Sequence, residues 1–294
     1  MCTAAIPYLT PPRPHNPQGR ARRVGVEIEF SGVSGLDAAV AVQRAVGGKL
    51  REVSPHRTRI ERTAIGEVTI ELDAKFVHPA SADDQDTLMS KAKALAGSVV
   101  QAVVPLELIT QPLEVTQLPQ VDRVVRSLRL AGAEGTEASP VYAFGLHLNP
   151  QVASYEPQYL VAILRAFTRK NRELREQIEP DGLRKVLGWA EPFAPDYIGL
   201  LDQPDYAPDQ EQLITDYVQA NPGRNYDLDM LPLFAFLDEA VVTRHLGEQS
   251  SAPRPTFHYR LPNSLVDQPD WSIAEDWNRW VEVERLAEDL LAQD

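Results

Sequence analysis

Residues 23–30 read Arg-Val-Gly-Val-Glu-Ile-Glu-Phe, and the fold is organised around this stretch. β-Branched residues and a terminal aromatic residue recur at every second position, which predicts a β-strand. The apolar face of this strand holds Val24, Val26, Ile28 and Phe30. Glu27 and Glu29 share the opposite face, about 7 Å apart for a rise of about 3.3 Å per residue. This pair is either solvated on a half-exposed strand or holds a cation or substrate between its carboxylates.

Composition argues against several classes of partner. The 294-residue chain is 43% hydrophobic, enough for one large core or two modest domains. Its 29 basic and 42 acidic residues give a net charge of −13, which argues against nucleic acid or an anionic membrane as the main partner. No stretch approaches the ~18 apolar residues that suggest a membrane span. Cys2 is the single cysteine, so we expect no disulfide, no thiolate metal site and a cytoplasmic location.

Three later stretches repeat the two-faced pattern, at residues 67–76, 104–109 and 141–150. Their polar faces carry Glu67, Glu71, Asp73, Glu107, His147 and Asn149. Each could be the wet face of a sheet, and a lone strand histidine is more often structural than a ligand. Carboxylates that converge on one sheet face repel each other unless they are neutralised, and Mg²⁺ takes oxygen ligands together with phosphates. The pattern therefore predicts a Mg²⁺ and phosphate-ester site, without a Walker-type glycine loop.

The remaining elements are predicted from periodicity and from breaking residues. A proline-rich arm covers residues 1–20, and the nearby Arg20, Arg22 and Arg23 are expected to be solvated. A hairpin is predicted from arms at 57–64 and 67–76, a loop-rich segment at 182–208 and a short strand at 254–263. Helices are predicted at 35–48, 83–103, 118–131, 155–179, 209–220, 228–246 and 271–291. We expect an α+β fold: one catalytic domain over 21–294, helical from about 151, with an antiparallel or mixed sheet that has an acidic concave face.

The residues of the strands also carry a resemblance to a known family. Gly25-Val-Glu-Ile-Glu-Phe resembles the first-strand signature of the carboxylate–amine ligases, which include glutamine synthetase and glutamate–cysteine ligase. The chain is similar to the amidoligase family of that superfamily in four further pieces over about residues 20–285. These pieces are Glu67-Val-Thr-Ile-Glu-Leu-Asp, the Glu107 strand with Thr110-Gln-Pro-Leu, Gly145-Leu-His-Leu-Asn and Tyr259-Arg-Leu-Pro-Asn-Ser. The resemblance implies a glutamine synthetase-like sheet, Mg-ATP as cofactor and an amide bond formed through an acyl-phosphate.

The resemblance also implies roles for individual residues. Metal ligation falls to Glu27, Glu29, Glu71 and Glu67. Catalytic roles fall to Glu107, His147 and Arg260, with Arg260 stabilising the transferring phosphoryl group and Glu107 on the metal or amine side. Cofactor contacts fall to His147, Asn149, Arg260 and Asn263. Asn149 stands where glutamine synthetase often has a second histidine.

Two other functions stay open from the residues alone. A metal-dependent hydrolase would use the same carboxylates and His147 on a water, and would need no nucleotide. A non-catalytic binding protein would keep the fold and use its acidic face for a cationic peptide or amine. The expected partners of a ligase are a small-molecule or peptide carboxylate and an amine, and residue types identify neither. The tryptophan-bearing C-terminal helix could form a homo-oligomer interface or close the core.

Overall fold

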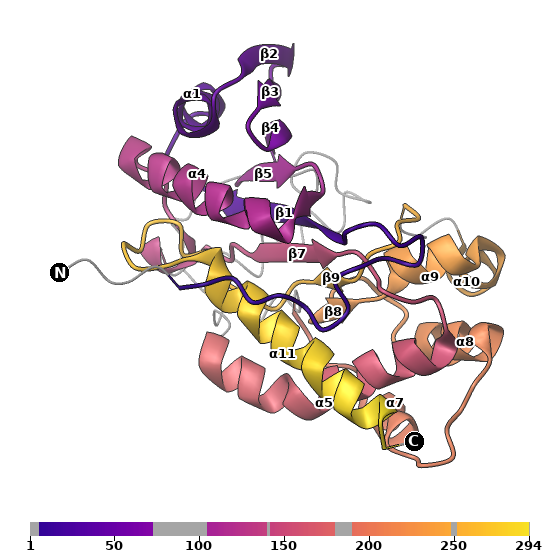
Figure 1. The fold of residues 1–294 in the computed structure, drawn as a ribbon. Coiled ribbons are helices and arrows are strands. Elements are labelled where there is room, and N and C mark those ends of the chain that lie inside the picture. Colours follow the sequence, from indigo (N-terminus) through magenta and orange to yellow (C-terminus); the bar gives the residue numbers. More distant parts are fainter. Residues whose placement is uncertain (1–5, 73–104, 140–141, 180–189, 248–251, 294) are drawn as a thin grey trace, which may run out of the picture.

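The computed structural model describes residues 6–72, 105–139, 142–179, 190–247 and 252–293. These residues form an α+β fold built on one open sheet of nine strands (Figure 1). The strand order is β2-β3-β4-β5-β1-β7-β9-β8, and β6 pairs with β1 outside this path. Neighbouring strands pair antiparallel throughout. The predicted α+β class is confirmed, and the sheet is of the antiparallel kind.

The strands in the described residues are β1 Arg23–Phe30, β2 Lys49–Ser54, β3 Arg57–Thr63, β4 Gly66–Leu72, β5 Leu106–Thr110, β6 Leu113–Glu114, β7 Leu146–Pro150, β8 Leu228–Asp229 and β9 His258–Tyr259. The α-helices there are α1 Gly35–Val46, α4 Leu118–Ala131, α5 Pro157–Ile178, α7 Pro195–Leu201, α8 Gln210–Ala220, α9 Leu231–Leu237, α10 Glu239–Leu246 and α11 Ile273–Leu291.

β1 is a central strand, between β5 and β7, and it has the predicted two-faced pattern. The four side chains of its apolar face, Val24, Val26, Ile28 and Phe30, are fully buried. Helix α1 packs against α4 and against the β3–β4 hairpin, while α11 packs against α5 and α4 (Figure 1). Because helices cover the apolar face, the carboxylates of β1 are left on the other side of the sheet.

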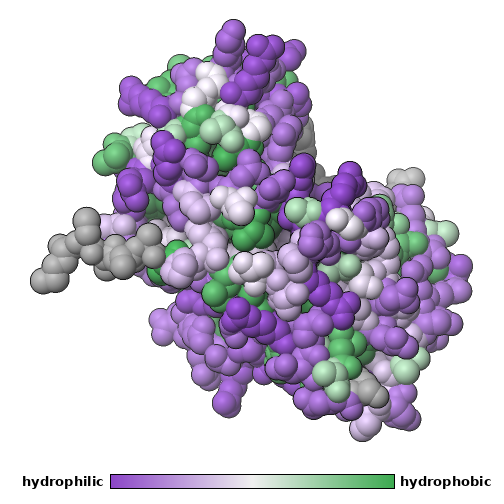
Figure 2. Space-filling model, viewed as in Figure 1, coloured by the Kyte–Doolittle hydropathy of each residue, from purple (hydrophilic) through white to green (hydrophobic). Residues whose placement is uncertain are grey.

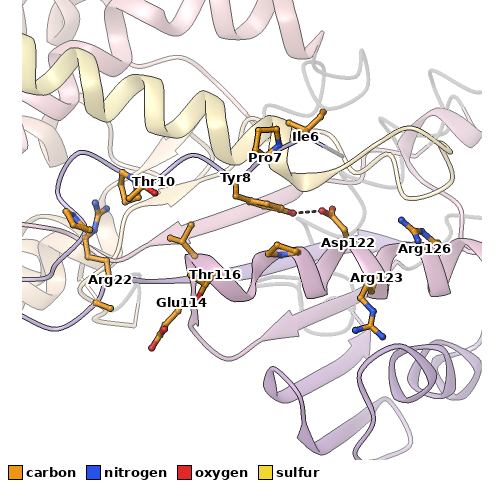
Figure 3. Close-up of a pocket in the computed structure, with 15 residues that line it drawn as sticks. Ile6, Pro7, Tyr8, Thr10, Arg22, Glu114, Thr116, Asp122, Arg123 and Arg126 are labelled. Carbon is orange, nitrogen blue, oxygen red and sulfur yellow. Dashed lines mark hydrogen bonds between the residues drawn. The ribbon is translucent and has the colours of Figure 1, made fainter. Parts of the chain in front are cut away.

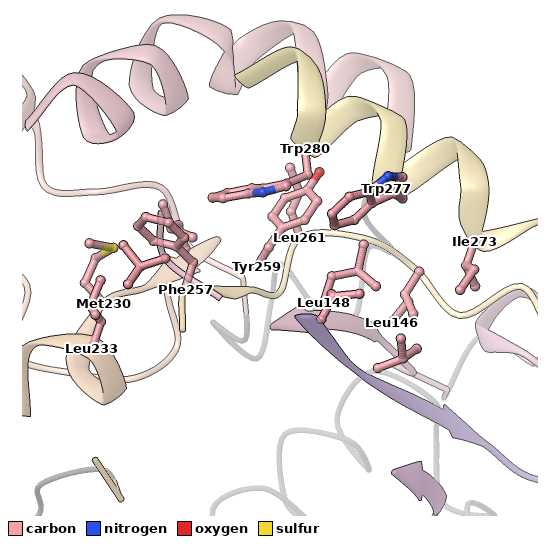
Figure 4. Close-up of a cluster of buried hydrophobic side chains, with 14 of the residues drawn as sticks. Leu146, Leu148, Met230, Leu233, Phe257, Tyr259, Leu261, Ile273, Trp277 and Trp280 are labelled. Atoms are coloured by element: carbon pink, nitrogen blue, oxygen red, sulfur yellow. The ribbon is translucent and has the colours of Figure 1, made fainter. Parts of the chain in front are cut away.

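The C-terminal helix α11 closes the core over β7 and β9. Figure 4 shows Leu146 and Leu148 of β7 facing Trp277 and Trp280 of α11. Both tryptophans are buried, and the ring centroid of Trp280 lies 5.7 Å from that of Tyr259. Of the two roles expected for this helix, the structure shows that its tryptophans pack inside the chain.

The proline-rich arm lies along α11, so that residues far apart in the sequence are side by side (Figure 1). The indole nitrogen Nε1 of Trp277 donates to the Leu9 carbonyl oxygen at 2.8 Å. Arg22 donates through both terminal nitrogens to Glu284, at 2.8 and 2.6 Å. The side chains of Arg22 and Glu284 are 3% and 2% exposed, so the prediction of a solvated Arg22 is wrong. Its buried partner lies in the last helix, which local sequence does not reveal.

The structure differs from the predicted elements in several places. Strand β2 was not predicted, because it is an edge strand whose side chains are nearly all exposed and show no apolar alternation. The predicted helix at 228–246 is instead β8, α9 and α10. Asp238 is extended (φ −156°), ends α9, and accepts from the Val241 N–H to cap α10.

Helix α7 lies inside the segment predicted as loop, because its Pro195 starts a helix instead of ending one. The strand predicted at 141–150 begins only at Leu146, and that at 254–263 shortens to His258–Tyr259. The helix predicted at 83–103 and the end of the strand predicted at 67–76 lie outside the described residues.

Asp276, in the first turn of α11, is expected to make stability depend on pH. Burial raises its pKa from 3.8 to about 6, partly offset by Arg279. Because the folded pKa exceeds the unfolded one, the stability from protonated Asp276 is fully present below about pH 4 and is lost as pH rises through 6. This loss amounts to about 3 kcal/mol.

The free energy of unfolding of Asp276→Asn, relative to that of the wild type, should therefore be larger at pH 7 than at pH 4.5. Urea unfolding at these two pH values measures it. Asp289→Asn, at an exposed position of the same helix, is the control. A wild-type-to-variant difference that does not change with pH would contradict the assignment.

The molecular face in Figure 2 is mainly hydrophilic, with apolar residues in small separate patches. Leu130 and Leu36 are the most exposed large apolar side chains in the described residues, at 82% and 64%. None of the helices that the structure describes is long and apolar enough to cross a membrane.

Candidate active site on the polar face of the sheet

Strand register brings the predicted carboxylates into one row across the sheet. Glu29 of β1 lies opposite Glu107 of β5, which in turn lies opposite Glu71 of β4. Glu71 lies opposite Arg57 of β3. Directly opposite residues in antiparallel strands point to the same side, so these side chains share the polar face.

A second row centres on Glu27, which lies opposite His147 of β7. The Nδ1 atom of His147 is 3.2 Å from Glu27 Oε2, and the Asn149 amide donates to Glu27 Oε1 at 2.9 Å. The other ring nitrogen of His147, Nε2, faces Glu29 Oε1 at 4.0 Å. The second oxygen of Glu29 accepts from the Gly145 N–H at 2.9 Å. His147 therefore stands between the two β1 glutamates.

The charge states of this pair follow from burial and neighbours. Burial raises the pKa of Glu27, but the hydrogen bond to His147 and the adjacent imidazole of His258 outweigh it and hold that pKa well below its usual range. Burial lowers the pKa of His147 well below its usual range, against the opposing hydrogen bond to Glu27. We therefore describe Glu27 as ionised and His147 as a neutral imidazole near pH 7.

Two residues of the site were not assigned from the sequence. His258 of β9 is 4% exposed, with Nε2 3.6 Å from Glu27 Oε2 and Nδ1 3.6 Å from Asp229 Oδ2. Its ring meets that of His147 edge-on, with centroids 5.2 Å apart. The alternation of Thr256, His258 and Arg260 places His258 on a polar face, which is a weak signal. No signal in the sequence indicated Asp229, because this residue fell in the helix predicted at 228–246.

Arg260 and Asn263 follow β9 and have defined partners. Arg260 is 3% exposed, its Nη1 donates to the Arg224 carbonyl at 2.5 Å, and its charge helps to lower the pKa of His147. The Asn263 amide donates to the carbonyls of Ile178 and Glu179 at the end of α5, at 3.3 and 3.2 Å. The Arg260 charge thus acts on His147, whereas the Asn263 amide caps a helix.

The other two predicted metal ligands are paired with arginines. Glu71 pairs with Arg57, and Glu67 lies 3.5 Å from Arg59. Among the described residues, the groups able to hold a metal are Glu27–His147–His258 and Glu29–Glu107–His147. Within each group the ligand atoms lie within 4.8 Å of one another. Neither group includes Glu67 or Glu71, whose metal role stays a prediction.

The sheet and its cluster lie inside the part of the chain that matches a known family. Residues 20–282 match the family described as "Putative amidoligase enzyme". The chain belongs to this family. Searches of curated proteins and of solved structures find no match. Membership of the amidoligase family indicates ligase activity and supports the predicted enzyme class at that level.

A separate cleft of about 660 Å³ lies between the arm and the start of α4. Figure 3 shows Tyr8 of the arm pointing at Asp122 of α4, to which its hydroxyl donates at 2.6 Å. The predicted catalytic, cofactor and metal residues do not line it. The cleft is therefore distinct from the carboxylate cluster.

Proposed function

We propose that this member of the amidoligase family is an ATP- and Mg²⁺-dependent carboxylate–amine ligase that forms an amide through an acyl-phosphate. The supporting observation is the placement of Glu29, Glu107, Glu27 and His147 on one sheet face, with buried Arg260 directly after β9. The substrates of this chemistry are a small-molecule or peptide carboxylate and an amine. A sheet of the glutamine synthetase kind is part of the same proposal.

The pair Glu29 and Glu107 suits Mg²⁺, because Mg²⁺ is usually bound by one or two carboxylates, waters and nucleotide phosphates. The two residues lie directly opposite on neighbouring strands, and their oxygens belong to one of the two candidate metal groups. When bound, Mg²⁺ would offset phosphate charge and orient the phosphates. The protein's task is then to position the groups and to stabilise charge.

Each nearby residue has a task in this scheme. The Arg260 guanidinium stabilises negative charge on the transferring phosphoryl oxygens, which a planar fork of N–H donors suits. The Gly145 N–H holds Glu29 by one oxygen and so fixes the direction of the other. A Glu107 carboxylate oxygen accepts a proton from the incoming ammonium, which frees the amine lone pair for attack.

Calorimetric titration of ATP with and without Mg²⁺ tests the proposal. Wild type is expected to bind ATP only with Mg²⁺, and Glu29→Gln to bind it at least about tenfold more weakly because one metal ligand loses its charge. Glu61→Gln is the matched control, because this β3 carboxylate pairs with Arg51 outside both metal groups. Absence of ATP binding under every condition would overturn the ligase proposal.

A metal-dependent hydrolase is the second candidate, favoured by the two histidines beside Glu27. Imidazole and carboxylate ligands with an open position are typical of metal sites that activate water. This candidate predicts turnover without nucleotide, so the same titration followed by a hydrolysis screen without ATP separates the two functions.

A further inference from the structure

Three donor atoms converge on the His258 side of Glu27. Glu27 Oε2 lies 3.2 Å from His147 Nδ1 and 3.6 Å from His258 Nε2. Ligands about 2.0–2.1 Å from a tetrahedral Zn²⁺ lie about 3.4 Å from each other. These two separations therefore match the edges of a tetrahedral site.

Neighbouring groups orient the same three atoms. The Asn149 amide donates a hydrogen bond to Glu27 Oε1, which leaves Glu27 Oε2 directed at the two histidines. Asp229, fully buried, faces His258 Nδ1 and is itself held by the Leu231 N–H at 2.9 Å. Metal-binding histidines usually have a carboxylate or carbonyl at the second ring nitrogen, which fixes the ring and its tautomer. His258 has this arrangement.

The contacts of His258 to Asp229 and Glu27, both 3.6 Å, are too long for hydrogen bonds. Both of its ring nitrogens are buried and have no hydrogen bond within the described residues. An unsatisfied buried polar group costs about 1–3 kcal/mol. Its Nε2 faces the space shared with Glu27 and His147, so a cation there would satisfy it.

His147 belongs to both candidate metal groups, and its tautomer determines which group it serves as a nitrogen ligand. A neutral imidazole has one N–H and one lone pair, so it binds one metal at a time. When a metal replaces the hydrogen bond to Glu27, it takes the Nδ1 lone pair, and the Nε2–H is left facing Glu29. The Glu29–Glu107 group then offers only oxygen, as Mg²⁺ requires, and the Glu27 group offers two nitrogens and one oxygen.

We propose that Glu27, His147 and His258 bind a transition-metal dication, Zn²⁺ in first place, at a site separate from the Mg²⁺–nucleotide site. Imidazole suits Zn²⁺, whereas Mg²⁺ prefers oxygen, so this donor set does not fit the Mg²⁺ predicted for Glu27. The three ligands leave a fourth position open, as in catalytic zinc sites. Bound there, Zn²⁺ would act as a Lewis acid beside the site of ligation. The proposal does not depend on nucleotide binding.

The first test is a Zn²⁺ titration of chelator-treated protein against a chromophoric chelator, with millimolar Mg²⁺ present and no nucleotide. One tight equivalent of Zn²⁺ is expected in the wild type. His258→Ala should bind it at least tenfold more weakly, and Asp229→Asn about 10–100-fold more weakly, because Asp229 orients a ligand. His56→Ala, at the exposed β2–β3 turn, is the matched control and should bind as the wild type does.

The second test uses the wild type alone, so it does not depend on how the variants fold. Co²⁺ substituted into the site should give the intense visible absorption of tetrahedral coordination, and Zn²⁺ should abolish it. The proposal would be overturned if bound Co²⁺ gave only weak octahedral bands or if Mg²⁺ displaced it. It would also be overturned if His258→Ala and His56→Ala lost the same affinity for Zn²⁺. ATP binding without tight Zn²⁺ would overturn this inference alone, and Zn²⁺ binding without ATP would overturn the ligase alone.

Discussion

Arg260→Lys is expected to lower kcat for ADP release by about 10³-fold, the low end of what a phosphoryl-stabilising arginine contributes. The lysine keeps the charge but loses the planar fork that matches phosphoryl oxygens. Affinity for Mg-ATP should change only a few-fold, because the lost interaction is strongest in the transition state. Arg260 is 3% exposed, so water does not replace the missing donors freely.

The measurement is ADP release with a carboxylate and amine pair found by screening, together with ATP affinity from calorimetry. Arg285→Lys is the control, because Arg285 forms a surface pair with Glu282 in α11. Equal kcat in the two variants would place Arg260 outside the reaction. A fall in ATP affinity as large as the fall in kcat would make it a ground-state binding residue instead.

The largest expected effect on stability is that of Glu284→Gln, about 3–5 kcal/mol, because the change leaves the Arg22 guanidinium buried without its counter-charge. Glu284 also accepts from the Trp280 indole at 2.7 Å, so the change disturbs a buried hydrogen bond within α11 as well. Urea unfolding followed by circular dichroism measures the loss. The double variant Arg22→Met with Glu284→Leu should recover most of it, because no charge then stays buried.

The chain provides a matched comparison for this pair. Arg13 and Glu288 also join the arm to α11, but their side chains are 39% and 30% exposed. Glu288→Gln should therefore cost less than about 1 kcal/mol, as solvated ion pairs do. If Glu284→Gln and Glu288→Gln lost the same stability, burial of the Arg22–Glu284 pair would not explain its contribution to stability.

Periodicity predicted the parts of the fold in which one element carries its own pattern. The two faces of β1 follow from its alternation, and α1, α4 and α11 follow from helical spacing to within two residues at most ends. Registers were not readable, yet they decide that Glu29 meets Glu107 and that Glu27 meets His147. The carboxylates could be predicted as candidates, but not their grouping.

The missed parts are those set by distant contacts. β8 and β9 are two residues long, so they form by pairing with each other and, for β9, with β7, and not from a local pattern. His258 and Asp229 meet only because of that pairing. Burial of Arg22 depends in the same way on Glu284. Local propensity does not identify such distant partners, because they meet only through tertiary packing.

The distance between Arg22 and Glu284 along the chain has a consequence for synthesis. They are 262 positions apart, and Arg22 directly precedes β1. At about 5–20 residues per second, a ribosome makes residue 284 roughly 13–50 s after residue 22. Throughout that interval Arg22, at the start of the strand that carries Glu27 and Glu29, cannot form its ion pair with Glu284. We therefore expect maturation of the carboxylate site to be a late event, completed after translation has passed the last helix.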